Sequence, residues 1–323
     1  MTSQPRMHPQ RNPLQVLLAL LAALLLPLAL TAAALAPGHS SHHARTWTVQ
    51  VGNESRNQAI QGMAFLPSNI WIDAKDTIRW KAASAEILTV TIHAAGQTLA
   101  STQPFDPSNP AELLRQGGTS YDGKSYYNSG VMANVSDSGF PATTTYSLTF
   151  PKTGTFTYWC LVHGMAMKGT VHVRKAGTPY PFSQWQYDRW SAKKARAILR
   201  DGYDLWEDTA DMATNHTVFQ GNDDGVAMVM RFIRPTVYVH VGQTVTFKNI
   251  GMGAPHTVTF GTEPANFLAP LGDPTHYSGG QLNSGLQPPG ASFAVTFTKE
   301  GTFSYICALH DYMGMVGKVV VED

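Results

Sequence analysis

The sequence predicts an all-β protein made of two tandem Greek-key β-sandwiches joined by a short helical linker. The chain has 323 residues, which is enough for two domains of roughly 100 to 150 residues each. Two long stretches resemble each other, and both alternate apolar and polar residues, as in residues 244–247. This alternation is typical of strands with one buried face, and turn residues punctuate the strands. Helical periodicity is confined to one segment between the two stretches.

The N-terminal segment, residues 1–36, has the order of an export signal. Arg6 and Arg11 precede an apolar run that ends in small residues. The run, residues 14–36, also exceeds the roughly 20 residues that cross a bilayer. We therefore expect an exported protein, periplasmic or extracellular, whose first segment is either removed after Ala34 or Ala36 or kept as a membrane anchor. A tether over residues 37–44 follows, and its histidines are His39, His42 and His43.

Residues 45–175 and 215–323 are predicted to be the two domains because they repeat each other. TFPKTGTFTYWC, ending at Cys160, aligns without a gap on TFTKEGTFSYIC, ending at Cys307. Upstream, residues 63–80 match residues 230–247, and NSGV at 128 matches NSGL at 283. The two cysteines of the chain therefore occupy equivalent positions in two copies of one unit. Since such positions rarely meet across domains, we expect free thiols rather than the disulfide that export favours.

Residues 176–214 are predicted to be the helical linker. The helical stretch begins near residue 183, and its charge changes from basic to acidic around Gly202. This pattern predicts two short solvated helices, and Trp185, Trp190 and Trp206 indicate that they also pack on a domain. The alternative is that the charges dock a partner.

The overall charge excludes one class of partner. The formal net charge is +1, and 14% of the residues are charged. Nucleic-acid binding needs a basic patch or stripe, and the sequence has none. We therefore expect no nucleic-acid partner.

Four potential metal ligands lie close together in the second copy. Cys307, His310 and Met315 share one loop between strands, and His256 begins another strand of the same copy. Each has an ordinary structural role when it is taken alone. Together, two imidazoles, a thiolate and a weakly bound thioether form the trigonal set that suits type 1 copper. Soft sulfur holds Cu(I) and imidazole accepts Cu(II), so we expect copper in both oxidation states.

These motifs resemble the cupredoxins, the plastocyanin and azurin family of blue copper proteins. CALHDYMGMVGKVVV has the Cys, His and Met spacing of that family, GAPHTVTF supplies the upstream His, and the resemblance covers both repeats. It implies that His256, Cys307, His310 and Met315 are copper ligands and that His310 lies near the surface as the electron port. Met313 is the competing axial ligand. Met315 is preferred because the axial Met of the family directly precedes the xGKV that opens the last strand.

The first copy departs from the family pattern. It offers Cys160, His163 and Met167, with Met165 as the rival methionine. Its ligand loop is one residue shorter than that of the second copy, which makes Met167 the methionine before the last strand. Without a second imidazole these residues form a partial site, which could hold Cu(I) with three ligands, bind Cu(II) weakly with water, or have become structural.

The missing ligand of the first copy is the upstream histidine. When TVTI at 89–92 is laid on TVTF at 257–260, Leu88 falls where His256 stands. His93 lies five residues along the strand, about 16 Å away at roughly 3.3 Å per residue, and on the opposite face. It therefore cannot replace the missing imidazole.

Three functions follow from these observations. The resemblance implies an exported carrier of single electrons with redox partner proteins outside the cytoplasm. The partial site and the tether histidines favour an alternative, an extracytoplasmic copper chaperone or store. A multicopper oxidase or nitrite reductase is least favoured, because such enzymes place histidines beside the ligand Cys. Here Ile306 and Ala308 flank Cys307, and Trp159 and Leu161 flank Cys160. We therefore expect a protein that is not an enzyme.

Overall fold

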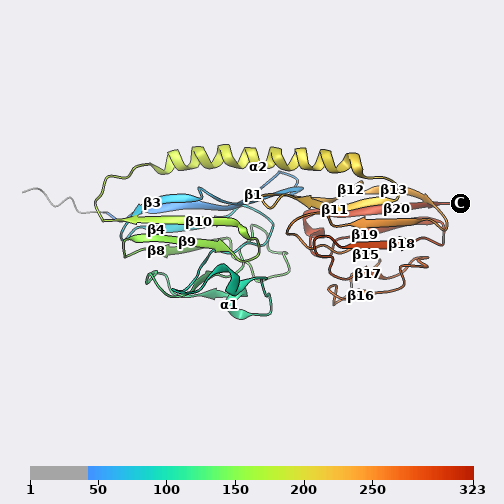
Figure 1. Ribbon diagram of the computed structural model, residues 1–323, viewed down its shortest axis with the longest axis horizontal. Coiled ribbons are helices and arrows are strands. Elements are labelled where there is room, and N and C mark those ends of the chain that lie inside the picture. The colour runs from blue at the N-terminus through green and yellow to red at the C-terminus, as the bar shows by residue number, and fades with distance from the viewer. Residues whose placement is uncertain (1–42) are drawn as a thin grey trace, which may run out of the picture. The chain divides into compact units, whose positions relative to one another are not determined.

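The computed structural model describes residues 43–323 (Figure 1). The predicted export segment and the tether residues His39 and His42 lie outside this range. Within it, no helix is both long enough and apolar enough to cross a membrane.

Strands make up most of both repeats. In the first repeat the elements are β1 (Thr46–Glu54), β2 (Ile60–Leu66), β3 (Asn69–Asp73), β4 (Thr77–Ala82), β5 (Thr91–Ile92), the 3-10 helix η1 (Leu99–Thr102), α1 (Pro110–Leu113), β6 (Arg115–Gln116), β7 (Tyr127–Ser129), β8 (Thr145–Thr149), β9 (Gly154–Cys160) and β10 (Gly164–Arg174). After helix α2 (Gln184–Met212), the second repeat contains β11 (Thr217–Asp223), β12 (Ala227–Ile233), β13 (Thr236–His240), β14 (Thr244–Lys248), β15 (Thr259–Phe260), β16 (Pro270–Leu271), β17 (Leu282–Ser284), β18 (Ser292–Thr296), β19 (Gly301–Ile306), the 3-10 helix η2 (Asp311–Met313) and β20 (Val316–Glu322).

Each repeat is a sandwich of two sheets, as the alternating pattern predicts. In the first repeat, β2-β1-β4-β8 face the six-stranded sheet β3-β10-β9-β5-β7-β6. In the second, β12-β11-β14-β18 face the sheet β13-β20-β19-β15-β17-β16. Large aromatic side chains fill the space between the sheets, among them Trp80 and Tyr158 in the first core and Phe247 and Tyr305 in the second. Each such buried side chain contributes about 1.5 to 3 kcal/mol of hydrophobic stabilisation.

The two sandwiches share one sheet. Strands β2 and β12 pair antiparallel, which joins four strands from each repeat into a single eight-stranded sheet. Ile60 pairs with Val229, and Gly62 pairs with Ala227. By the sequence repeat, Ile60 is the counterpart of Ala227 and Gly62 is the counterpart of Val229. The two copies thus meet edge to edge through the same strand, in the self-complementary manner of a two-fold dimer interface.

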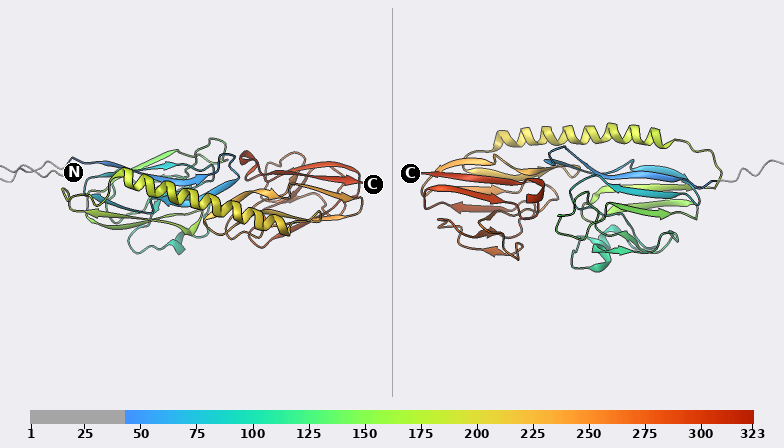
Figure 2. Two further views of the ribbon diagram at one scale, coloured as in Figure 1. Left: turned by 90° about the horizontal axis from the view of Figure 1, so that it is seen from above. Right: turned by 180° about the vertical axis from the view of Figure 1, so that it is seen from behind.

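Helix α2 corrects the expectation of two short helices. It is one continuous helix of 29 residues, begun by a capping box at Ser183, and it packs on β1, β2, β11 and β12 (Figure 2). Gly202 lies buried within it, where an added Cβ would come 2.3 Å from Cγ2 of Ile60. The glycine allows the helix to approach the sheet closely and does not end it.

The tryptophans of the linker separate into two groups. Trp206 packs on the apolar cluster beneath the helix, where Ile60, Phe219 and Val229 are buried. In contrast, Trp185 and Trp190 are 64% and 46% exposed. The expected packing through the tryptophans therefore holds for Trp206, whereas the N-terminal half of the helix packs on the first repeat through the buried Tyr187.

Candidate metal centre

Three predicted ligands of the second repeat lie together. The Nδ1 atoms of His256 and His310 are 3.1 Å apart, and the Sγ of Cys307 lies 3.7 Å and 3.4 Å from them, respectively. All three residues are buried, and among the described residues they form the one group of three or more His, Cys, Asp or Glu placed to share a metal ion. Separations of this size are those of donors that each lie about 2 Å from one ion.

Backbone hydrogen bonds hold Cys307 at the end of β19. The N–H of Thr257 donates to the Cys307 sulfur at 3.4 Å, and the Thr257 hydroxyl accepts the N–H of Ala308 at 2.7 Å. Thr257 directly follows His256, so these contacts also fix the histidine beside the cysteine. Two neighbouring strands that are far apart in the sequence thereby bring the donors together.

Polar side chains fix the loop that precedes His256. The Asp223 carboxylate accepts the N–H groups of Met252 and Gly253 at 2.9 Å and 3.1 Å. Asn249 donates to the carbonyl of Ala254 at 2.9 Å. The imidazole is therefore presented by a loop whose backbone is held by buried partners.

The methionines of the ligand loop point to different cores. Met315 is buried in the same apolar cluster as Cys307, and its carbonyl accepts the Cys307 N–H at 3.0 Å. Met313 is buried among the residues of the other repeat's core. This arrangement favours Met315 over Met313 as the fourth donor.

Burial keeps the donors of the second repeat uncharged. It lowers the pKa of His310 to about 4 and the pKa of His256 well below its usual value, with a further decrease in the pKa of His256 from His310. Burial also raises the pKa of the Cys307 thiol to about 11. The imidazoles are therefore ready to bind a cation, whereas the thiol must lose its proton to the solvent when metal binds.

This donor set fits copper. Two neutral imidazoles and a thiolate, with a thioether in the same apolar cluster, match the soft and borderline donors of a type 1 site. The sulfur already accepts a backbone N–H, as an anionic ligand requires.

A model of the copper binding proteins of the plastocyanin/azurin family matches residues 53–174 and again residues 219–322. The chain belongs to this family. A plastocyanin of Mercurialis perennis is 37% identical over 106 residues, which are 32% of this chain and 98% of that protein. Plastocyanin A'/A'' of Nicotiana tabacum is 35% identical over 105 residues, with the same two shares. Amicyanin from Paracoccus versutus is a solved structure with 25% identity that covers 33% of this chain and 79% of that chain at a TM-score of 0.22.

The cupredoxin assignment makes copper the cofactor of this chain. It also confirms the predicted fold class of two tandem cupredoxin-like sandwiches. Both cysteines are free and buried, as their equivalent positions in the repeat predict.

The first cupredoxin repeat holds the same framework around Cys160. The N–H of Thr89 donates to the Cys160 sulfur at 3.4 Å, and the Thr89 hydroxyl accepts the N–H of Leu161 at 2.8 Å. His163 Nδ1 lies 3.4 Å from the same sulfur. Met167 is buried in the cluster that contains Cys160, whereas its rival Met165 is 75% exposed.

Leu88 occupies the place of the missing imidazole. Thr89 and Thr257 contact the two cysteines alike, which supports the register that sets Leu88 against His256. Gly52 and Gly221 are equivalent, because each lies at the register shift in the first strand of its repeat. A Cβ added at Gly52 would meet Cδ1 of Leu88, and one added at Gly221 would meet Nε2 of His256. The two side chains therefore fill equivalent space. His93 does not replace the imidazole, because its Nε2 is paired with the hydroxyl of Thr102 at 2.9 Å.

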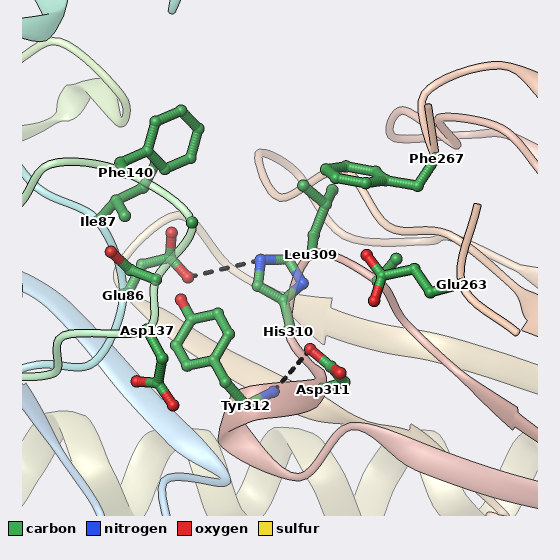
Figure 3. Close-up of a pocket in the computed structure, with 13 residues that line it drawn as sticks. Glu86, Ile87, Asp137, Phe140, Glu263, Phe267, Leu309, His310, Asp311 and Tyr312 are labelled. Carbon is green, nitrogen blue, oxygen red and sulfur yellow. Dashed lines mark hydrogen bonds and ion pairs between the residues drawn. The ribbon is translucent and has the colours of Figure 1, made fainter. Parts of the chain in front are cut away.

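His310 is not the surface port that the resemblance implies. Only 6% of its surface is exposed, because the first repeat covers it. Its Nε2 lies 3.6 Å from a carboxylate oxygen of Glu86, which belongs to the loop between β4 and β5 (Figure 3). The edge-to-edge pairing of the two repeats encloses this edge of the imidazole.

Sequence reasoning missed the residues that support the site. Thr257, Asn283 and their counterparts Thr89 and Asn128 recur in the repeat, where each asparagine binds the second Thr of the TVT motif. Their recurrence in both repeats is a sequence signal from which their supporting role could have been predicted. Glu86 gives no such signal, because its counterpart in the repeat is Ala254.

Proposed function

We propose that this chain is an exported blue-copper protein that carries single electrons through a type 1 copper in its second repeat. The observation that carries the proposal is the buried cluster of His256, Cys307 and His310, with Met315 in the same apolar cluster. Copper supplies the change between Cu(II) and Cu(I). The chain supplies a donor set that both oxidation states accept.

The surrounding residues keep these donors in place during the change of oxidation state. Thr257 fixes the sulfur, and the backbone of the 307–315 loop is tied to the β19 end by the Cys307 and Met315 pairing. Gly314 turns the loop with a φ of 90°, a conformation that favours glycine. A site fixed in this way needs little rearrangement when an electron arrives.

The proposal is tested by loading the purified chain with copper and recording its visible spectrum and copper content. We expect one strongly blue copper per chain, since a thiolate bound to Cu(II) gives an intense charge-transfer band. His256→Ala should greatly weaken that band. A copper-loaded protein without a blue band would contradict the proposal.

We propose an electron carrier rather than an enzyme because Ile306 and Ala308 flank Cys307 where oxidases of this type use histidines. The protein should exchange electrons with small redox partners and show no turnover with oxygen, phenols or nitrite. Steady turnover that survives removal of contaminating metals would overturn this assignment.

A second function, a copper store or chaperone outside the cytoplasm, is favoured by the partial site of the first repeat. Cys160, His163 and Met167 supply soft and borderline donors, and Leu88 closes the remaining side with an apolar group. Such a site suits Cu(I) better than Cu(II). Copper content under reducing conditions separates the two functions: two Cu(I) per chain support the store, and one supports the carrier alone.

The location and partners belong to the same proposal. Residues 1–36 support export, with removal or membrane anchoring of that segment, and the partners of the carrier are redox proteins outside the cytoplasm. The chain's small net charge gives no support for a nucleic-acid partner.

A further inference from the structure

The surface between the two repeats contains a cavity that leads to His310. It measures about 260 Å³ and is lined by residues of both repeats (Figure 3). Four carboxylates line it: Glu86, Asp137, Glu263 and Asp311. No lysine or arginine is among its lining residues, so the imidazole of His310 is the one basic side chain that lines it.

The imidazole of His310 separates the metal donors from the cavity, with one ring nitrogen on each side. Its Nδ1 faces Cys307 and His256 at 3.4 Å and 3.1 Å, so this atom is the metal donor. Its Nε2 faces the Glu86 carboxylate at 3.6 Å. When Nδ1 binds a metal, Nε2 must carry the remaining proton, and that proton points toward Glu86.

Glu86 needs such a partner. Its side chain is 6% exposed, and its Oε2 has no hydrogen-bond partner. A buried, unpaired carboxylate oxygen is costly, and the Nε2 proton of His310 is the nearest donor that would satisfy it. The distance of 3.6 Å exceeds a hydrogen bond by about half an ångström, which a small movement of either side chain would close.

The backbone around Glu86 is held toward the second repeat. The Glu54 carboxylate accepts the N–H of Ala85 at 2.9 Å, and the hydroxyl of Tyr312 donates to the Ala85 carbonyl at 3.2 Å. Tyr312 lies two residues after His310 in the ligand loop. The residue before Glu86 is thus tied directly to the loop that carries the copper ligands.

The sequence repeat allows Glu86 to be compared with its counterpart in the second repeat. The register that pairs Leu88 with His256 also pairs Glu86 with Ala254. Ala254 belongs to the apolar cluster that contains Cys160 and Met167. The ligand histidine of the second repeat therefore has a carboxylate of its neighbour beside it, whereas the equivalent position in the second repeat contributes only a methyl group to the cluster around Cys160.

We propose that Glu86 of the first repeat is the outer partner of the copper ligand His310 and lowers the reduction potential of the copper in the second repeat. This inference rests on the proposed function. Glu86 is a positioning residue: it accepts the Nε2 proton, fixes the plane of the imidazole and makes it a stronger donor. A stronger donor stabilises Cu(II) more than Cu(I). The first repeat thereby becomes part of the metal centre that it covers.

The test compares copper-loaded variants of the full chain by their reduction potentials. Glu86→Gln keeps the shape of the side chain and replaces the carboxylate with a weaker, uncharged acceptor. The potentials are compared at pH 8, because burial raises the pKa of the Glu86 carboxyl to about 7. Outer partners typically contribute about 10- to 100-fold in metal affinity. Because the stronger donor acts mainly on Cu(II), we expect about a tenfold loss of Cu(II) affinity relative to Cu(I). A tenfold change corresponds to a rise of about 59 mV for one electron. Glu86→Asp, which keeps the charge, should remain closer to the wild type.

The matched control is Asp137→Asn, which removes an equal charge from the same cavity. Asp137 is exposed, so solvent screens its charge, and the potential should change little. If Glu86→Gln and Asp137→Asn shift the potential equally, Glu86 has no special role and the inference fails. A merely structural Glu86 would lower the melting temperature of Glu86→Gln and leave the potential unchanged.

A second measurement does not depend on the potential. In the Cu(I) protein, which is diamagnetic, NMR should show the His310 Nε2 proton protected from exchange with water, and Glu86→Ala should speed its exchange. Equal exchange in both proteins overturns the inference. A wild-type protein without a blue band would refute the proposed function instead, so the two failures are distinguishable.

Discussion

At the scale of single residues, one side chain accounts for the donor that the partial site of the first repeat lacks. Position 256 carries an imidazole and position 88 an isobutyl group, while the residues around them are matched. In both repeats a threonine N–H donates to the cysteine sulfur at 3.4 Å, and a histidine Nδ1 lies 3.4 Å from that sulfur. The difference in donor number therefore comes from Leu88 and not from a change of framework.

Leu88→His should consequently restore the missing donor. Because histidine fits the space of leucine, we expect blue copper to rise from one toward two per chain. Burying a polar ring in the absence of metal should lower the free energy of unfolding by about 1 to 3 kcal/mol. Visible absorbance and copper content measure the first effect, and chemical denaturation of the copper-free protein measures the second.

The control is Cys160→Ser in the Leu88→His background, which should return the blue copper to one per chain. If Leu88→His folds but adds no blue band, the shortened loop at Met167 has lost the geometry that a full site needs.

Copper(II) binding should strengthen as the pH rises. With a His310 pKa of about 4 and a Cys307 pKa of about 11, the site holds neutral imidazoles and a protonated thiol between those values. Above the Glu86 pKa of about 7, binding releases one proton, so the apparent association constant should increase about tenfold per pH unit. Below about pH 4, protonation of His310 should steepen the dependence. Competition with a chelator, corrected for the chelator's own protonation, measures the slope; a constant affinity from pH 5 to 8 would be inconsistent with a protonated buried thiol.

At the scale of elements, the sequence predicts the strands better than the helix. The repeat and the period-two alternation identify β14, β9 and β19, because each exposes one face and buries the other. The charge change near Gly202 suggested a break in the linker, since glycine disfavours a helix by about 1 kcal/mol. The break does not occur because α2 packs on Ile60, a contact between residues far apart in the sequence.

Gly202→Ala should therefore destabilise the protein, although alanine is the better helix former. The new methyl group would lie 2.3 Å from the buried Ile60, so either the side chain or the helix must shift. Overpacking of this kind costs about 1 to 3 kcal/mol. Denaturant unfolding measures the change, with exposed Asp201→Ala as the neighbouring control, for which we expect an effect within about 0.5 kcal/mol. An increase in stability for Gly202→Ala would show that the helix does not approach the sheet this closely.

At the scale of the whole described chain, the pairing of β2 with β12 makes one folding unit of the two repeats. The N–H of Met63 donates to Val226 and the N–H of Met230 to Ala59, at 2.7 Å and 2.8 Å. These amides should exchange with solvent as slowly as those of β19 and β20, because opening them requires disruption of the shared sheet. Native-state hydrogen exchange measures this, and fast exchange at both positions would mean that the repeats separate independently.

The enclosure of His310 could not be predicted from the sequence. The motif around Cys307 indicates the ligands because they lie within nine residues of one another, with His256 one strand away. Glu86 and Tyr312 come together only because the repeats pair edge to edge, as the contact between Tyr312 and Ala85 across 227 residues shows. Local sequence patterns identify the metal ligands, whereas the environment of the site depends on how the two similar domains are joined.

The central claim, that the second repeat holds the blue copper, is tested most directly by comparing two serine variants. Cys160→Ser and Cys307→Ser change equivalent buried residues in the two repeats, so any general effect of losing a buried thiol is shared. The visible spectra of both proteins, recorded after identical copper loading, give the answer. We predict that Cys160→Ser keeps the full blue band and that Cys307→Ser loses it. A blue band that survives in Cys307→Ser and disappears in Cys160→Ser would contradict the account.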